Sequence, residues 1–296
     1  MLIPTRVSSI SNLAFNLFQE MWPSYFFANK FHRAEEEEEQ QDHPSDGHPD
    51  CLIESFSFGP SINVDDCNQA VLPQSYFIEV PHINQEQTWD CGLACVLMVL
   101  KTLGINNCNI NELVEICCTN SIWTVDLAYL LKRFGVTFSY FTVTLGANPN
   151  FSAETFYKEQ LSSDRLRVDT LFQRAMEDGI CIKCRSISGE EISLLILSGK
   201  CIAIALVDQY KLSRTWLEDV CLPGFYSGSA GYTGHYIVIC GYDADTDEFE
   251  IRDPASSRKH EKVSAGSLEN ARKSFGTDED LLLISLGDGG NHRKSL

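Results

Sequence analysis

The chain has 296 residues, and its 41 acidic against 23 basic side chains give a formal net charge of −18 at pH 7. An excess of negative charge repels phosphate backbones and argues against a nucleic-acid partner. The hydrophobic content of 44% is ordinary for a globular protein, and the longest apolar runs, such as residues 201–207, are far too short to span a bilayer.

Composition divides the chain into four regions. Residues 1–33 form an N-terminal extension, and residues 34–69 begin with the acidic run AEEEEEQQDHPSDGHPD, which predicts a disordered linker. Residues 70–286 have the composition of a globular domain, and residues 287–296 are a polar tail. We find no secretory signal, so the twelve cysteines are expected to be reduced thiols in the cytoplasm or the nucleus.

Hydrophobic periodicity predicts a series of helices and strands within the globular region. In chain order they are a strand at 75–83, helices at 91–103, 110–119 and 123–135, a strand at 136–144, helices at 153–161 and 167–179, a strand at 180–187, a helix at 189–199, strands at 200–208, 235–243 and 248–254, a helix at 267–276 and a strand at 280–286. Helices dominate the first half and strands the second. This order is typical of an α+β domain in which a helical subdomain packs against one face of an antiparallel sheet.

Cys91 begins the apolar helix 91–103, directly after the polar turn INQEQTWD. The free N–H groups and the dipole at a helix start favour a thiolate, and an activated thiolate needs a base, most often histidine. Of the seven histidines, His235 opens a strand after the glycine-rich segment PGFYSGSAGYTG, which lets a substrate approach the backbone. Asp253 ends the next strand, so a hairpin should bring it to His235 as the third member of a catalytic triad.

Gln85 lies six residues before Cys91. Its side-chain amide can donate to an oxyanion beside the thiolate, which gives the polar turn a function. Each residue also has a purely structural interpretation: Cys91 as a buried helix thiol like Cys95, His235 as a core histidine, and Asp253 as the start of a turn. Their common register favours an active site.

The best candidate for a metal site is the acidic segment DADTDE, in which Asp243, Asp245 and Asp247 alternate at the tip between two strands. Alternating carboxylates in a loop can hold an oxygen-loving cation such as Mg²⁺. A solvated turn explains the same residues. The chain has no Walker-type lysine loop and no G-x-G-x-x-G after a strand, and the basic residues of 252–259 are the nearest candidates for a phosphate.

The order of Gln85, Cys91 in DCG, His235 in GHY and Asp253 in DP resembles the papain-like thiol peptidases, and among them the branch that processes bacteriocin leaders. A longer set of motifs resembles the guanylyl cyclase 1 family of plants, whose animal relatives are named for a guanylyl cyclase domain. These motifs are MWPSYFFANKF, VPHINQ, WDCGLACVLMVL, LKRFGV, GANPNF and SFGTDEDLLLISL. The similarity extends over residues 21–286.

The two resemblances imply one papain-like α+β fold and different chemistries. The guanylyl cyclase family is assigned the magnesium-dependent conversion of GTP to cyclic GMP, which implies GTP as substrate and Mg²⁺ as cofactor, with Asp243 and Asp245 as the candidate ligands. The peptidase resemblance implies a thiol hydrolase that uses Cys91, His235 and Asp253 on a peptide-like substrate. A third alternative is a pseudoenzyme that binds a peptide or a ubiquitin-like tail in the same cleft.

Overall fold

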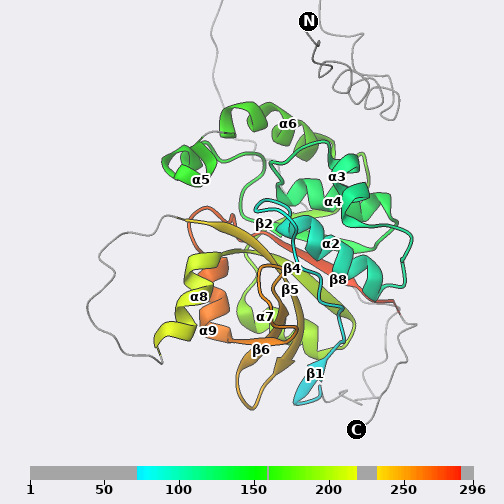
Figure 1. Cartoon of the computed structure of the whole chain (residues 1–296), viewed down its shortest axis with the longest axis vertical. Coiled ribbons are helices and arrows are strands. Elements are labelled where there is room, and N and C mark those ends of the chain that lie inside the picture. Colours follow the sequence, from blue (N-terminus) through cyan, green and yellow to red (C-terminus); the bar gives the residue numbers. More distant parts are fainter. Residues whose placement is uncertain (1–71, 159, 219–231, 288–296) are drawn as a thin grey trace, which may run out of the picture. The chain divides into compact units, whose positions relative to one another are not determined.

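A computed structural model describes residues 72–158, 160–218 and 232–287 (Figure 1). All of them belong to one compact unit within residues 67–296. The predicted N-terminal extension and acidic linker, and the polar tail beyond Gly287, lie outside the described residues, so those boundaries stay predictions. Within the described part, no helix combines the length and the apolarity that crossing a bilayer requires.

Each predicted helix and strand of the globular region is present. The helices are α2 (Cys91–Thr102), α3 (Ile110–Cys117), α4 (Thr124–Arg133), the 3₁₀ helix η1 (Pro149–Ala153), α5 (Thr155–Lys158), α6 (Leu161–Arg174), α7 (Gly189–Leu197), α8 (Gln209–Glu218) and α9 (Ala265–Arg272). The strands are β1 (Ser75–Phe77), β2 (Phe138–Thr142), β3 (Ile182–Cys184), β4 (Cys201–Asp208), β5 (Gly234–Asp243), β6 (Glu248–Arg252), β7 (Glu261–Ser264) and β8 (Leu281–Ser285). Helix α8 and strand β7 were not predicted.

The strands form one mixed sheet in the order β3–β2–β8–β4–β5–β6–β7, and β1 pairs with the end of β5. The pairs are antiparallel except for β2 with β3, which α6 connects. A parallel pair needs such a crossover, because its second strand must start again at the same edge. The predicted α+β architecture, with a helical part against an antiparallel sheet, is confirmed.

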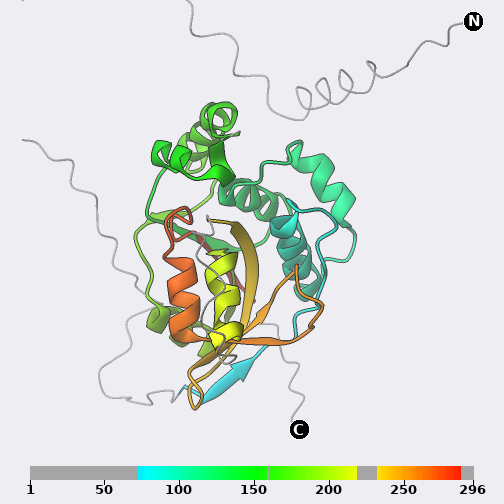
Figure 2. The same ribbon diagram turned by 60° about the vertical axis from the view of Figure 1, so that its left-hand side comes forward.

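Strand β4 shows why helices cover both faces of the sheet. Ile202 and Ile204 belong to the core beneath α2 and α4, whereas Ala203 and Ala205 belong to a second core beneath α7 and α9 (Figures 1 and 2). All eight β4 residues are buried as a result. The prediction of helices on one face was wrong in this respect, because an unbroken apolar run such as CIAIALV is typical of a strand buried on both sides.

Gly92 lets α2 lie close against the sheet. A Cβ atom at this position would come 3.0 Å from Cδ1 of Leu127 on α4 and 3.0 Å from Cδ2 of Tyr236 on β5. Both side chains lie in the core and have little room to move. The glycine of the DCG motif therefore sets how near Cys91 comes to the start of β5, where His235 follows Gly234.

Gly92→Ala is expected to lower the free energy of unfolding by about 1 kcal/mol, because overpacking outweighs the better helix propensity of alanine. Gly266→Ala in α9 is the matched control, since a Cβ atom there meets nothing within 4 Å. That change should stabilise the protein by up to about 1 kcal/mol. Urea denaturation of both variants measures the difference, and equal stabilisation by the two would contradict the close packing.

Candidate active site

Cys91 is the first residue of α2, and its side chain is almost buried, with 6% exposed. The N-cap residue Asp90 makes no side-chain hydrogen bond to the helix, and the first turn contains no acidic residue. The positive end of the helix dipole and its first N–H groups are therefore left for the sulfur, which favours a thiolate. One turn further on, burial raises the pKa of Cys95 well above the ordinary thiol value, and the nearby Cys91 adds to this effect.

His235 lies between Cys91 and Asp253. Its Nε2 is 2.7 Å from Oδ1 of Asp253, and its side chain is also hydrogen-bonded to the side chain of Cys91. Because Nε2 faces the carboxylate, Nδ1 is the nitrogen that faces the sulfur. The β5–β6 hairpin brings His235 and Asp253 together as the sequence predicted.

The environment of His235 favours a protonated imidazole. Burial alone lowers the pKa of His235, but the hydrogen bonds with Asp253 and Cys91 outweigh it and raise the pKa to about 9. Burial raises the pKa of Asp253, yet the hydrogen bond with His235 outweighs that effect, and the net pKa is lowered. At neutral pH the ring is thus an imidazolium placed between the carboxylate of Asp253 and the sulfur of Cys91.

Gln85 lies in the turn that precedes α2 and contacts the loop that carries Asp253. Its Nε2 donates to the backbone carbonyl of Gln87 at 2.7 Å, and its backbone N–H donates to the carbonyl of Pro254 at 3.0 Å. Only the NH₂ end of the amide can donate to a carbonyl, so this bond determines the amide orientation and leaves a second N–H. Among the described residues, Oε1 of Gln85 is buried and has no hydrogen-bond partner.

Two further side chains tie this turn to the loop after β6. His82 Nε2 lies 2.9 Å from the carbonyl oxygen of Asp253, and Asn84 Nδ2 donates to the carbonyl of Ser256 at 2.6 Å. They hold the segments that carry Gln85 and Asp253 next to each other. Neither residue was predicted to link these two segments, although both lie in the motif VPHINQ; the signal was their polar character directly after a strand.

A hollow of about 360 Å³ lies between the turn and this loop. Its lining consists of Asn84, Gln85, Glu86, Gln87, Thr88, Pro254 and Ala255. None of these lining residues is Lys or Arg, and Glu86 adds a negative charge. The hollow therefore fits an uncharged polar group better than a triphosphate.

The predicted metal ligands lie at the other end of β5. Asp243 is eight residues from His235, about 26 Å along an extended strand. Lys262 Nζ is 3.8 Å from Oδ2 of Asp243, and Gln74 Nε2 donates to Oδ1 of Asp245 at 2.7 Å. A cation and an amide donor thus stand where a metal ion would bind.

No group of three His, Cys, Asp or Glu side chains suited to a metal ion occurs among residues 72–158, 160–218 and 232–287. As arranged, Asp243 and Asp245 do not fit Mg²⁺, and no chemical step is assigned to a metal here.

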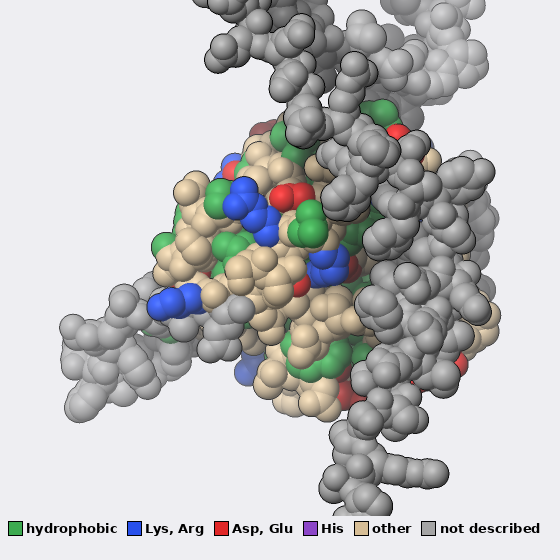
Figure 3. Space-filling model, turned by 90° about the horizontal axis from the view of Figure 1, so that it is seen from above, with side chains coloured by type: hydrophobic (Ala, Val, Ile, Leu, Met, Phe, Trp, Pro, Cys, Tyr) green, Lys and Arg blue, Asp and Glu red, His purple; other side chains and the backbone are tan. Residues whose placement is uncertain are grey.

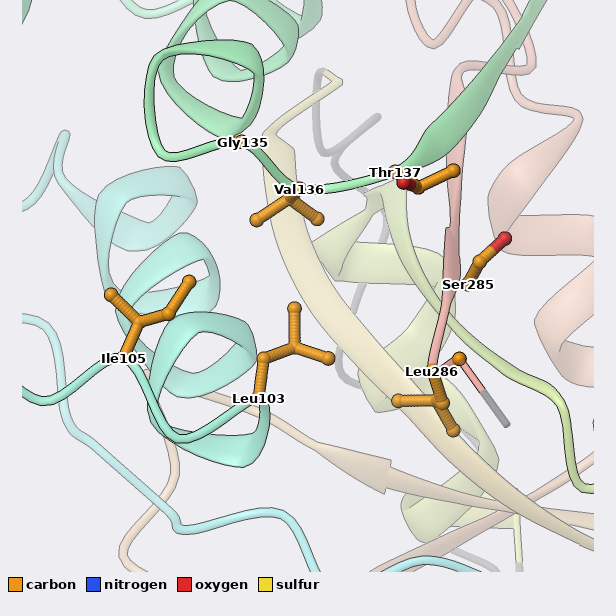
Figure 4. A pocket seen from close by; sticks show the side chains of 8 residues that line it. Leu103, Ile105, Gly135, Val136, Thr137, Ser285 and Leu286 are labelled. Carbon is orange, nitrogen blue, oxygen red and sulfur yellow. The ribbon is translucent and has the colours of Figure 1, made fainter. Parts of the chain in front are cut away.

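A second hollow, also lined by described residues, is poorly suited to a phosphate. This hollow of about 380 Å³ at the far end of α2 is mainly apolar, with Leu103, Ile105, Val136 and Leu286 in its lining (Figure 4). Because α2 has 12 residues, this hollow lies about 18 Å from Cys91. On the face drawn in Figure 3, Lys and Arg side chains lie in small separate groups among acidic and uncharged ones.

Three solved structures that show some similarity to this chain are peptidases of low sequence identity. A putative C39-like peptidase from Bacillus anthracis is 14% identical, with 71% of this chain and 96% of that chain covered and a TM-score of 0.41. The peptidase domain of Streptococcus ComA, a bifunctional ABC transporter of a quorum-sensing pathway, is 15% identical, with 70% and 98% covered and a TM-score of 0.36. Xylellain, a cysteine protease from Xylella fastidiosa, is 13% identical, with 73% and 87% covered and a TM-score of 0.39.

Sequence comparison identifies the family. Guanylyl cyclase 1 of Arabidopsis thaliana is 58% identical over 268 residues, which are 90% of this chain and 97% of that protein. The family model described as guanylylate cyclase matches residues 80–284, a segment that includes Gln85, Cys91, His235 and Asp253. This chain therefore belongs to the guanylylate cyclase family.

Proposed function

We propose that this family member acts through the thiol of Cys91, as an acyl-transfer enzyme that hydrolyses amide or ester bonds of a peptide-like substrate. The observation that carries the proposal is the position of His235, which is buried, hydrogen-bonded to Cys91 and 2.7 Å from Asp253. An imidazole held in this way takes a proton from the thiol and later donates it to a leaving group.

The residues divide the reaction as follows. The sulfur of Cys91 attacks the carbonyl carbon, and the carbonyl electrons move to oxygen to form an oxyanion. Gln85 and the N–H of Cys91 at the helix start stabilise that charge. When the bond to the leaving group breaks, the leaving group takes the proton of His235. Water, deprotonated by the neutral imidazole, then hydrolyses the thioester and restores the thiol.

p-Nitrophenyl acetate, a small acyl donor, tests the thiol directly. The wild type is expected to release a burst of p-nitrophenolate and to carry an acetyl group on Cys91, which peptide mass spectrometry can locate. Cys91→Ala should lose that burst and retain only the slow acetylation of other thiols. A wild type whose Cys91 is acetylated no faster than Cys95 would contradict the proposal and favour a binding module.

Magnesium-dependent cyclisation of GTP is the second candidate, because a relative that is 58% identical bears the name guanylyl cyclase 1. In that reaction the ribose 3′-hydroxyl attacks the α-phosphorus and pyrophosphate leaves. It requires cations around the phosphates, and a thiolate has no role in it. The arrangement of Asp243 with Lys262, and the absence of Lys or Arg from the lining of the hollow near Gln85, give this chemistry less support.

A GTP-turnover assay on highly purified protein separates the two candidates. Wild type, Cys91→Ala and the double variant Asp243→Asn with Asp245→Asn are compared with and without magnesium. Under the thiol proposal, any trace turnover is unaffected by the loss of Cys91. Robust cyclic GMP formation that the double variant abolishes, with an unchanged melting temperature, would instead establish cyclisation at the hairpin tip.

A further inference from the structure

Asp90 occupies the N-cap of α2 without capping it. Asp90 is only 2% exposed, and its side chain makes no hydrogen bond to the helix. An N-cap aspartate ordinarily accepts the N–H of the second or third helical residue. Here the carboxylate turns back, so that Oδ1 accepts the N–H of Gln87 at 3.0 Å and Oδ2 accepts the N–H of Glu86 at 3.3 Å.

These bonds connect Asp90 to Gln85 through one peptide group. Asp90 holds the N–H of Gln87, and the carbonyl of Gln87 accepts Nε2 of Gln85 at 2.7 Å. The backbone of Gln85 is fixed separately by the carbonyl of Pro254. The direction of the Gln85 amide thus depends on the turn that Asp90 closes.

The charge of Asp90 is unfavourable for the neighbouring thiolate. A carboxylate one residue from Cys91 repels a negative sulfur and offsets the positive potential that the helix N-terminus exerts on it. Activation of the thiol therefore does not explain an aspartate here, and neither does helix capping, since Asp90 makes no capping hydrogen bond. The buried charge is better explained by the two backbone N–H groups that it holds.

We propose that Asp90 is the positioning residue of the oxyanion site, which holds the 85–90 turn so that the second N–H of Gln85 points at the substrate oxygen. This inference rests on the proposed thiol chemistry. It makes a specific prediction, because the sulfur of Cys91 reacts with p-nitrophenyl acetate through an oxyanion and with iodoacetamide without one.

Asp90→Asn is expected to slow acylation of Cys91 by p-nitrophenyl acetate about tenfold or more, as loss or displacement of an oxyanion donor does. The amide presents an NH₂ group to one of the two N–H donors, so the turn loosens. Alkylation by iodoacetamide forms no oxyanion, and removing a negative charge favours the thiolate. Its rate at pH 6.5 should therefore equal or exceed that of the wild type.

Asp126→Asn is the matched control, since Asp126 is a buried carboxylate in the first turn of α4 that accepts the backbone N–H of Trp123. Asp126→Asn should leave the ratio of the acylation rate to the alkylation rate of Cys91 unchanged. Gln85→Ala, like Asp90→Asn, should slow the acylation of Cys91 without slowing its alkylation. The double variant should be acylated no more slowly than the slower of the two single variants. Asp90→Ser keeps a helix-capping side chain but cannot hold the N–H groups of both Glu86 and Gln87. It should therefore also slow acylation without slowing alkylation, even if Asp90→Asn folds poorly.

Equal loss of both reactions in Asp90→Asn and Asp90→Ser would show a merely structural residue and overturn the inference. Acylation by both variants at the wild-type rate would also overturn it, while leaving the thiol chemistry in place. A wild type without Cys91-dependent acylation would contradict the thiol chemistry itself, and the role of Asp90 with it.

Discussion

Replacing His235 by alanine is expected to slow alkylation of Cys91 at pH 6.5 by about 10- to 100-fold. An ordinary thiol with a pKa near 8.5 is only about 1% thiolate at this pH. The imidazolium of His235, whose pKa is raised to about 9, places a positive charge beside the sulfur of Cys91, and loss of that charge should slow the attack of the sulfur on an electrophile. Limiting iodoacetamide followed by peptide mass spectrometry measures the rate at each cysteine.

The pH profile distinguishes this effect from simple exposure. Cys118, Cys181 and Cys184 are exposed, whereas Cys91 is buried. The rate at Cys91 relative to the rates at the exposed thiols should therefore be highest near pH 6 and should fall as the pH approaches 9, where His235 loses its proton. Asp253→Asn should slow Cys91 less than His235→Ala, because the imidazole remains. A rate at Cys91 that is unchanged in His235→Ala would contradict the ion pair.

The sequence predicted the pair His235–Asp253 well because the interaction is local. The two residues are 18 positions apart on one hairpin, and strand alternation with a short turn determines which residues meet. Gln85 and Cys91 are closer still, on one turn and one helix start. Such patterns are fixed by backbone geometry and can be recognised in a single sequence.

Contacts to distant backbone could not be predicted in the same way. His82 and Asn84 bind carbonyl groups some 170 positions away, and Asp90 binds backbone N–H groups, so no side-chain pattern reveals them.

Strand β7, which has only four residues, alternates buried and exposed positions too briefly to be recognised. Helix α8 has a low apolar content, so its sequence lacks a clear helical repeat of apolar residues.

The second large effect is expected at Asp280, which directly precedes β8. The residue is 6% exposed, and Tyr140 donates its hydroxyl to Oδ2 at 3.0 Å. Burial, with the charge of Asp278 in addition, raises the pKa of Asp280 to about 8, and the surrounding hydroxyls lower it only in part. The folded protein therefore carries a neutral carboxylic acid here at neutral pH.

The sign of the linkage follows from this raised pKa. An unfolded chain releases the proton near pH 3.8, whereas the folded protein keeps it to about pH 8. The stabilisation is complete below pH 3.8 and is lost as the pH rises toward 8, by about 1.4 kcal/mol per pH unit. His235 acts in the same direction only between pH 6.5 and about 9, so the range from pH 4.5 to 6 reports mainly on buried acids such as Asp280.

Asp280→Asn is expected to raise the free energy of unfolding at pH 7 by about 2 to 4 kcal/mol, and to leave it nearly unchanged at pH 4. Asparagine matches the protonated acid in shape, accepts the hydroxyl of Tyr140 and has no proton to lose. Urea denaturation of wild type and variant at pH 4, 6 and 7 measures the difference, with Asp245→Asn at the exposed hairpin tip as a control that should show no such trend. A difference between Asp280→Asn and wild type that stays constant with pH would mean that Asp280 is ionised in the folded protein, and that the hydroxyl groups around it stabilise a buried charge.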